Sequence, residues 1–267
     1  MPIITLTTDL GNVDHYVAKV KGKLLSLNPQ HTIVDISHQV KPYNIIEAAF
    51  LLKNSFKSFP KGSIHLVSVL TASYSDNSPS TETPNHIAFK YKDHYFIGPN
   101  NGIFPMLYNE KPEEIVLLEI EEIDDHQSFS VGNLYARAAD FLAKGGILKM
   151  LGSQIDEVYE KNRLQPTYSE SYVQGAVVHI DHFGNLITNI KKAEFSTAAR
   201  NRDFEIELGF NHSVYEICQW YGEVSQGDII ALFNADGFLE IAINQGNAHN
   251  LLGIKLHDNI RISIHAY

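Results

Sequence analysis

Residues 175–190 read GAVVHIDHFGNLITNI, and this stretch indicates how the second half of the chain folds. An alternating apolar run ends at Asp181, and a second short apolar run follows Asn185. Such alternation is typical of strands, and the Gly-Asn pair between the runs favours a β-hairpin turn. The same corner gathers a carboxylate, the ring of Phe183 and a carboxamide, a set that could hold a flat ring with polar edges such as a purine. Both interpretations stay open on this segment alone.

The rest of the C-terminal part has the same character. Short apolar runs alternate with polar turns, which predicts a small β-barrel or sandwich. The expected strands are residues 175–181, 186–190, 203–208, 228–233, 238–243 and 260–265.

In the N-terminal part, stretches with the apolar pattern of strands alternate with stretches that have the apolar pattern of helices. This order predicts an α/β fold with a mostly parallel sheet and crossover helices. Asn44 is the expected N-cap of the second helix. A polar stretch around 163–171 predicts a linker between an N-terminal α/β domain, residues 1–162, and a C-terminal β-barrel-like domain, residues 172–267. The expected strands are 3–7, 32–36, 63–70, 86–90, 94–97 and 114–120, the helices 14–27, 44–56 and 134–144, and the loops 71–85 and 121–125.

Composition limits the classes of partner. The 267 residues carry a net charge of -10, which disfavours binding to a nucleic-acid backbone or to an anionic membrane surface. Cys218 is the single cysteine, no apolar run is long enough for a membrane span, and no basic leader begins the chain. We therefore expect a soluble, cytoplasmic protein with no metal or cofactor. His179 and His182 flank Asp181, and exposure on a strand explains them better than metal binding.

Seven segments, spread in order over nearly the whole chain, carry a resemblance to known proteins. They are TTDLG (7–11), YVAKVKG (16–22), IVDISHQVKPY (33–43), FPKGSIH (59–65), GPNNGIF (98–104), HIDHFGNLITNI (179–190) and GFLEIAINQGNA (237–248). Together they resemble one family, the SAM hydroxide adenosyltransferases, or adenosine-forming SAM hydrolases, which are related to the SAM-dependent fluorinase and chlorinase. The resemblance implies an α/β domain followed by a barrel-like domain, and a homotrimer with the site between the N-terminal domain of one subunit and the C-terminal domain of the next.

The resemblance assigns three ligand-binding roles to the N-terminal part. Asp9 matches the carboxylate that holds the ribose diol, and an ionised carboxylate can accept both hydroxyl protons. Asp14 matches a position near the methionine amino group, and Tyr43 matches an aromatic over the sugar or sulfonium. The alternatives are a helix cap for Asp9, an N-cap for Asp14 and a core position for Tyr43.

Five further roles fall in the C-terminal part. By resemblance, Asp181 lies near the amino group, Phe183 stacks on adenine and Asn185 contacts the adenine edge. Backbone groups around Asn244 and Gln245 are expected to contact the same edge.

The sequence departs from the family at the water-activating set of Asp, Arg and His. Leu70 stands at the aspartate position, Ser130 at the histidine position, and no arginine precedes Arg137. A hydroxide nucleophile needs a charge or a base, and leucine and serine supply little of either. The nucleophile therefore stays unidentified. Ser73, Tyr74 and Asp76 of the 71–85 loop could re-form a catalytic group, although a surface loop is the simpler interpretation.

The halogenases also lack this set, and Asn100-Asn101 resembles their turn. However, Val131 replaces both the serine of the fluorinase and the glycine of the chlorinase. Asp236 stands where the halogenases carry an arginine for the methionine carboxylate, and like charges repel. Adenosine or another 5′-substituted adenosine would therefore suit the site better than intact SAM.

Three functions follow from these observations. The first is hydrolysis of SAM to adenosine and methionine by displacement at C5′, with SAM as substrate. The second is a non-catalytic protein that binds SAM or adenosine. The third is a structural role in which only the trimer matters.

Overall fold

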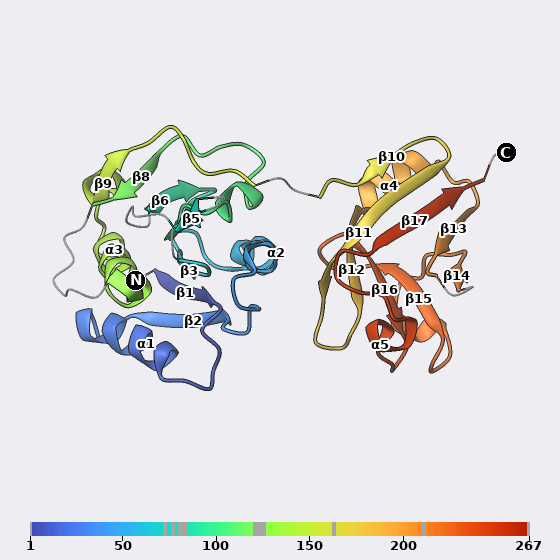
Figure 1. Cartoon of the computed structure of the whole chain (residues 1–267), viewed down its shortest axis with the longest axis horizontal. Coiled ribbons are helices and arrows are strands. Elements are labelled where there is room, and N and C mark those ends of the chain that lie inside the picture. The colour runs from blue at the N-terminus through green and yellow to red at the C-terminus, as the bar shows by residue number, and fades with distance from the viewer. Residues whose placement is uncertain are drawn as a thin grey trace. The chain divides into compact units, whose positions relative to one another are not determined.

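The computed structural model describes residues 2–71, 74–75, 78–79, 85–119, 127–161, 164–209 and 212–265. The chain divides into two compact units, residues 1–161 and 162–267 (Figure 1). The first unit is α/β and the second is mostly β. The division into domains at residues 1–162 and 172–267 stays a prediction.

Unit 1 is built on a seven-stranded sheet of order β2-β1-β3-β7-β6-β8-β9. The first four strands are mutually parallel, and the β6–β7 hairpin then introduces antiparallel pairing. A separate antiparallel pair joins β4 and β5. The strands are β1 (Ile3–Thr8), β2 (Thr32–Ser37), β3 (Ile64–Ser68), β4 (Tyr74–Ser75), β5 (Ser78–Pro79), β6 (His86–Tyr91), β7 (His94–Pro99), β8 (Ile115–Leu118) and β9 (Gly152–Gln154).

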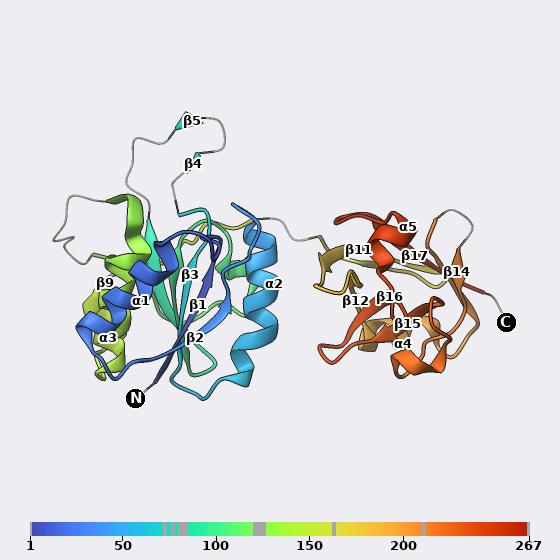
Figure 2. The ribbon, with the colours of Figure 1, turned by 90° about the horizontal axis from the view of Figure 1, so that it is seen from below.

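Helices cover both faces of this sheet (Figure 2). Helices α1 (Tyr16–Leu27) and α3 (Leu134–Ala143) bury their apolar sides on one face in a core with Ile4 and Leu6 of β1. Helix α2 (Ile45–Ser55) packs on the other face. Short 3₁₀ turns complete the unit at η1 (Phe56–Ser58), η2 (Phe104–Met106), η3 (Gln127–Gly132) and η4 (Leu148–Leu151).

The helix boundaries test two capping predictions. The side chain of Asn44 accepts the backbone N–H of Glu47 at 3.1 Å, so the predicted cap of α2 is confirmed. The alternative role of Asp14 as an N-cap is wrong, because α1 begins at Tyr16 and its cap position is His15, without a side-chain cap bond. The backbone bends at residues 12–15, and the helix begins two residues later than predicted.

Unit 2 is an antiparallel sheet of order β14-β13-β17-β11-β12-β16-β15, with β10 paired to β11. After β14 the chain bridges back to β15 at Cys218 and Leu232, which brings the two ends of the sheet together into a barrel-like form. The strands are β10 (Thr167–Tyr168), β11 (Tyr172–Ile180), β12 (Leu186–Lys191), β13 (Phe204–Glu207), β14 (Ser213–Val214), β15 (Ile229–Phe233), β16 (Phe238–Ile243) and β17 (Asn259–Ile264), and the helices are α4 (Lys192–Ala199), η5 (Tyr221–Glu223) and α5 (Ala248–Leu252).

The predicted fold class is confirmed in both units. The parallel strands β1, β2 and β3 carry the expected crossover helices, and residues 175–190 form the β11–β12 hairpin. Ser73, Asp76 and the acidic stretch 121–125 lie outside the described residues, and only the backbone of Tyr74 is described. None of the helices in the described ranges is long and apolar enough to cross a bilayer.

A buried polar chain crosses the middle of the unit 1 sheet. The hydroxyl of Thr5 lies 2.7 Å from Nδ1 of His65, and Nε2 of His65 lies 3.1 Å from Nδ1 of His94. Burial, and then the nearby His94, lower the pKa of His65 to about 3. The folded protein therefore keeps His65 neutral, while the unfolded chain binds a proton below about pH 6.5.

This difference predicts an acid-sensitive fold. Stability from His65 is fully present above about pH 6.5 and is lost as the pH falls toward about 3, because the unfolded state takes up the proton. His65→Gln should shrink the difference in unfolding free energy between pH 7.5 and 5.5 by about 1.4 kcal/mol. Urea unfolding at the two pH values measures this, with His265→Gln, an exposed position, as control. An unchanged difference in a folded His65→Gln protein would contradict the assignment.

Candidate functional site

The carboxyl ends of the parallel strands form one candidate site in unit 1. Asp9 follows β1 directly, and its Oδ2 accepts the backbone N–H of Tyr43 at 2.9 Å. Two predicted ligand-binding residues, 34 positions apart, therefore share one corner. Ligands in open α/β sheets bind at this edge of the strands. Among the described residues, the Asp9 carboxylate makes no helix-capping bond, so that alternative role is wrong.

Tyr43 and Asp14 are both accessible near this edge. The Tyr43 side chain is 71% exposed, so its alternative role as a core residue is wrong. Its backbone has a φ of 67°, a left-handed conformation that costs a non-glycine residue about 1–2 kcal/mol. Asp14 lies in the exposed turn before α1, and its side chain has no hydrogen bond or ion pair with other described residues. The structure thus joins Asp9 to Tyr43 and leaves Asp14 separate.

Leu70 is held by the turn that follows β7. Asn101 donates its side-chain amide to the carbonyls of Val69 and Leu70, each at 2.9 Å. Asn100 accepts the backbone N–H of Tyr159 at 2.9 Å. Both asparagines therefore shape the backbone at this edge of the sheet. Leu70 has a φ of 49° and is half-buried, and its side chain supplies no charge or proton acceptor.

Ser130 is paired with a histidine that the sequence reading missed. Its hydroxyl lies 3.1 Å from Nε2 of His86, and the hydroxyl of Tyr135 lies 2.7 Å from Nδ1 of the same ring. Burial lowers the pKa of His86 to about 4, so the ring is neutral at pH 7. His86 begins β6 opposite Pro99, at the same edge as Asp9. Val131 beside it is buried in the core with α1 and α3.

The second candidate site is the β11–β12 turn of unit 2. The carboxylate of Asp181 accepts the backbone N–H groups of Phe183 and Asn185, both at 2.9 Å, and the side-chain amide of Asn185 at 3.1 Å. The Phe183 ring is 71% exposed, whereas Asn185 is buried. The hairpin and the gathered polar groups predicted from the sequence are therefore one structure. Asp181 mainly builds the turn that presents the ring.

A glycine lets this turn pack against the start of α5. Gly184 has a φ of +84°, and a Cβ there would lie 2.2 Å from the Asn247 side chain. The Gly184 carbonyl accepts the backbone N–H of His249 at 2.9 Å, and Asn247 caps α5 by accepting from Asn250 at 2.8 Å. The segments around 183 and 245 therefore lie side by side, as the predicted adenine contacts require.

Asn244 and Gln245 differ in whether their backbone groups are available to contact a ligand. The N–H of Asn244 donates to Asp228, and its carbonyl accepts from Gly227 at 2.9 Å. Its side chain donates to the carbonyl of Val224 at 2.8 Å. Gln245 adopts a φ of 56° and makes no hydrogen bond with other described residues. Of the two predicted backbone contacts, Gln245 is the one with groups available.

A buried acid near Asp181 is a further feature that the sequence did not reveal. Glu240 is 3% exposed and accepts the Tyr221 hydroxyl at 2.5 Å and the Asn234 amide at 3.3 Å. Burial raises the pKa of Glu240, the two hydrogen bonds oppose this rise, and the Asp181 charge adds to it. Burial and the Glu240 carboxylate likewise raise the pKa of Tyr221. The partners lie 19 and 6 positions from Glu240, and no spacing motif links them.

Comparisons with known proteins show the family to which the chain belongs. Residues 4–152 match the SAM hydroxide adenosyltransferase N-terminal domain, and residues 175–261 match the C-terminal domain. The chain belongs to the SAM hydroxide adenosyltransferase family. The sequence-based recognition is thus confirmed at the level of the family.

Individual relatives of this family member extend over the full chain. A protein named (R)-S-adenosyl-L-methionine hydrolase from Methanocaldococcus jannaschii is 31% identical over 98% of this chain and 96% of its own. A fluorinase from Actinoplanes sp. is 26% identical over 91% of each. The crystal structure of an uncharacterized conserved protein from Thermotoga maritima has a TM-score of 0.86 at 27% identity, covering 98% of this chain and 100% of that one.

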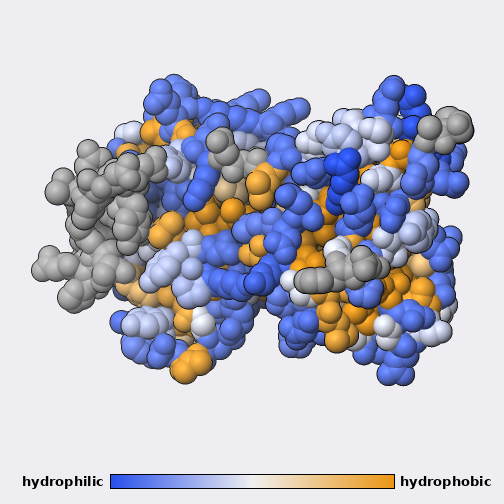
Figure 3. Space-filling model, turned by 45° about the vertical axis from the view of Figure 1, so that its right-hand side comes forward, coloured by the Kyte–Doolittle hydropathy of each residue, from blue (hydrophilic) through white to orange (hydrophobic). Residues whose placement is uncertain are grey.

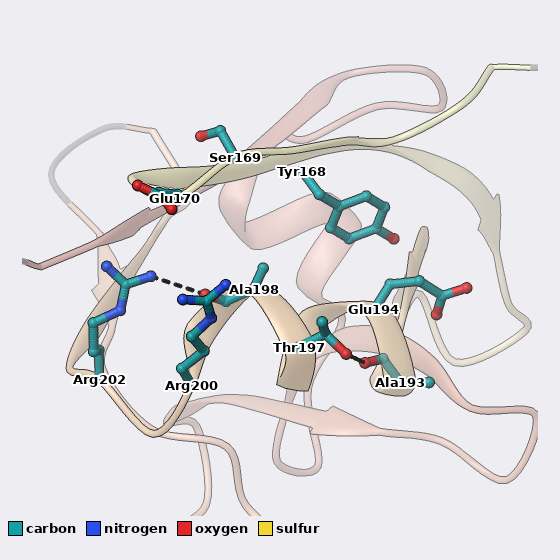
Figure 4. Close-up of a pocket in the computed structure, with 9 residues that line it drawn as sticks. All are labelled: Tyr168, Ser169, Glu170, Ala193, Glu194, Thr197, Ala198, Arg200 and Arg202. Atoms are coloured by element: carbon teal, nitrogen blue, oxygen red, sulfur yellow. Dashed lines mark hydrogen bonds between the residues drawn. The ribbon is translucent and has the colours of Figure 1, made fainter.

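A separate groove of about 580 Å³ lies between β10 and α4 in this family member (Figure 4). The guanidinium groups of Arg200 and Arg202 lie at one end, and Tyr168 and Glu194 lie at the other. Arg202 donates to the carbonyls of Ala198 and Ala199 at the end of α4, at 2.9 and 3.2 Å. None of the residues predicted to bind ligand lines this groove. Arg202 binds the carbonyl groups at the end of α4.

The Asp181 turn leads to a stability prediction. Asp181→Ala removes an acceptor from two backbone N–H groups, so we expect the protein to lose about 1–3 kcal/mol of unfolding free energy. Asp236→Ala is the matched control, because Asp236 is an exposed turn residue whose carboxylate has no hydrogen bond to the rest of the described chain. Urea unfolding followed by circular dichroism measures both. Equal stability of the two variants would show that Asp181 does not hold the turn.

Proposed function

We propose that this protein binds an adenosyl compound and hydrolyses SAM to adenosine and methionine by displacement at C5′. The observation that carries the proposal is the joining of Asp9 to Tyr43 at the carboxyl edge of the parallel sheet. The named hydrolases and fluorinases among the relatives support the same class of ligand. In the reaction a water oxygen forms a bond to C5′, the bond from C5′ to sulfur breaks, its electron pair leaves with neutral methionine, and the water loses one proton.

Each corner would contact a different part of the nucleoside. The Asp9 carboxylate would accept the ribose hydroxyls, with Tyr43 beside the sugar and sulfonium. Asp14, exposed in the next turn, is proposed near the methionine amino group. Phe183 would stack on adenine. The amide nitrogen of Asn185 already donates to Asp181, so its oxygen would accept from the adenine amino group.

The same residues support assembly into a homotrimer, in which the two corners would come from different subunits. Large apolar side chains are exposed at Val13 (97%) and Tyr43 (71%) in unit 1 and at Phe183 (71%) and Trp220 (63%) in unit 2. Hydrophobic residues also gather on the face of unit 2 in Figure 3. Apolar surface patches mark interaction sites where they are large and contiguous. Neither a nucleic acid nor a membrane is proposed as a partner.

The second candidate function is binding without catalysis. It is favoured by Leu70, which offers no charge, and by the Ser130–His86 pair, in which the imidazole is neutral. Incubation of the pure protein with SAM, followed by chromatography, distinguishes the two. Adenosine and methionine in equal amounts, above a heat-killed control, support hydrolysis. Calorimetric binding of adenosine without turnover supports the binding protein, and no binding at millimolar concentration contradicts both.

Asp9 provides the mutational test. Asp9→Asn removes the negative charge that would accept the ribose hydroxyls, so adenosine binding should weaken by roughly 1.5–3 kcal/mol. Titration calorimetry with adenosine measures the change. Asp203→Asn is the control, because it removes an equal charge from an exposed position of unit 2 to which no ligand contact is assigned. Equal affinity of wild type and Asp9→Asn would refute the assignment of Asp9 to the ribose.

A further inference from the structure

Behind the Asp9 corner, four side chains form a continuous polar chain. The Thr8 hydroxyl lies 2.8 Å from Nδ1 of His38. Nε2 of His38 lies 3.1 Å from Oδ1 of Asp35, and the other Asp35 oxygen accepts from Lys21 at 2.6 Å. Thr8 and His38 are buried, with exposed fractions of 0% and 4%. The chain thus runs from the surface of α1 to the residue directly before Asp9.

The carboxylate of Asp35 and the hydroxyl of Thr8 flank the His38 ring. Burial raises the pKa of Asp35, but its contacts with Lys21 and His38 outweigh this, so that the pKa lies below its ordinary value. Nε2 of His38 lies at ion-pair distance from the Asp35 carboxylate, without a hydrogen bond to it. The Thr8 hydroxyl lies beside Nδ1 and also accepts the backbone N–H of Leu10 at 3.3 Å.

The backbone of His38 also binds the segment that contains Asp9. Its carbonyl accepts the backbone N–H of Gly11 at 2.8 Å. The segment 8–11 is consequently attached to His38 at both ends, through Thr8 and through Gly11. Asp9 lies between these attachments, and its carboxylate reaches Tyr43, five residues after His38. His38 is therefore the common anchor of the two segments that meet at the Asp9 carboxylate.

We propose that His38 is a positioning residue that aims the Asp9 carboxylate at the ribose diol, and so determines selectivity for a ligand with free 2′ and 3′ hydroxyls. This inference rests on the proposed function, because it requires that Asp9 binds the sugar. His38 itself would touch no ligand atom. It would act by fixing the backbone of residues 8–11, and a misplaced carboxylate would lose the two hydroxyl bonds without affecting the stacked base.

The chain supplies a matched control. His31 directly precedes β2 and His38 directly follows it. Both are buried, with exposed fractions of 6% and 4%, and both face an aspartate at 3.1 Å, Asp140 in the case of His31. They lie at opposite edges of the sheet, and only His38 lies at the carboxyl edge. His31→Gln therefore reproduces the loss of a buried imidazole without disturbing the Asp9 corner.

The experiment measures the affinities of adenosine and of 2′,3′-dideoxyadenosine by titration calorimetry on the full chain. In wild type and His31→Gln, adenosine should bind more tightly than the dideoxy compound. In His38→Gln that preference should fall about tenfold, equivalent to ~1.4 kcal/mol, while the affinity for the dideoxy compound stays unchanged. A general loss of structure would weaken both ligands alike, so the ratio isolates the positioning role.

Thr8 supplies a second pair of variants if His38→Gln does not fold. Thr8→Val removes the hydroxyl and should reduce the preference, whereas Thr8→Ser retains the hydroxyl and should preserve it. An unchanged preference in folded His38→Gln or Thr8→Val overturns the inference and leaves the proposed function standing. Wild-type protein that binds neither compound, or binds both equally, overturns the ribose role of Asp9 and the inference with it.

Discussion

The hydrogen bond from the backbone of Tyr43 to the carboxylate of Asp9 is the contact on which the N-terminal site depends. It joins the end of β1 to the connection between β2 and α2. Tyr43 adopts a left-handed backbone that is unfavourable for a tyrosine, and a charge-assisted bond of 2.9 Å offsets that cost. The carboxylate and the backbone that carries the exposed ring are thereby held together before any ligand arrives, which lowers the entropy lost on binding.

Unit 2 also combines a carboxylate that accepts backbone N–H groups with an exposed aromatic ring. Asp181 accepts two backbone N–H groups and holds a tight turn, and the ring of Phe183 projects from it. Tyr43 and Phe183 are equally exposed, at 71%. Each corner thus pairs a backbone-binding carboxylate with an aromatic ring in water. A ring on a fixed backbone keeps only its side-chain torsions to lose, so it makes an economical stacking surface.

Periodicity predicted the elements with a visible apolar repeat, and it failed for helices too short or too sparsely apolar to show one. The strands β1, β2 and β3 and the helix α2 were all expected near their observed bounds, because alternation or a helical repeat is visible in each. Helix α4, KAEFSTAA, was missed because only Phe195 and Ala199 of its eight residues are buried. Helix α5 was missed because five residues are too few for a repeat. The eight proposed site residues came from motifs. The pairing of Ser130 with His86 could not be predicted, because the two residues lie 44 positions apart and meet only through the fold.

The absence of a charged group at Leu70 and Ser130 does not by itself exclude displacement by a neutral water. In a displacement by neutral water, positive charge moves from the sulfonium to the incoming oxygen. The transition state is therefore stabilised by acceptors near the water, and a cation there would oppose it. The carbonyls of Val69 and Leu70 each accept one bond from Asn101, and a carbonyl oxygen has two lone pairs. Neutral His86 adds no opposing charge at this edge. Under the proposed hydrolysis, the reaction would therefore require these acceptors to orient one water in line with sulfur.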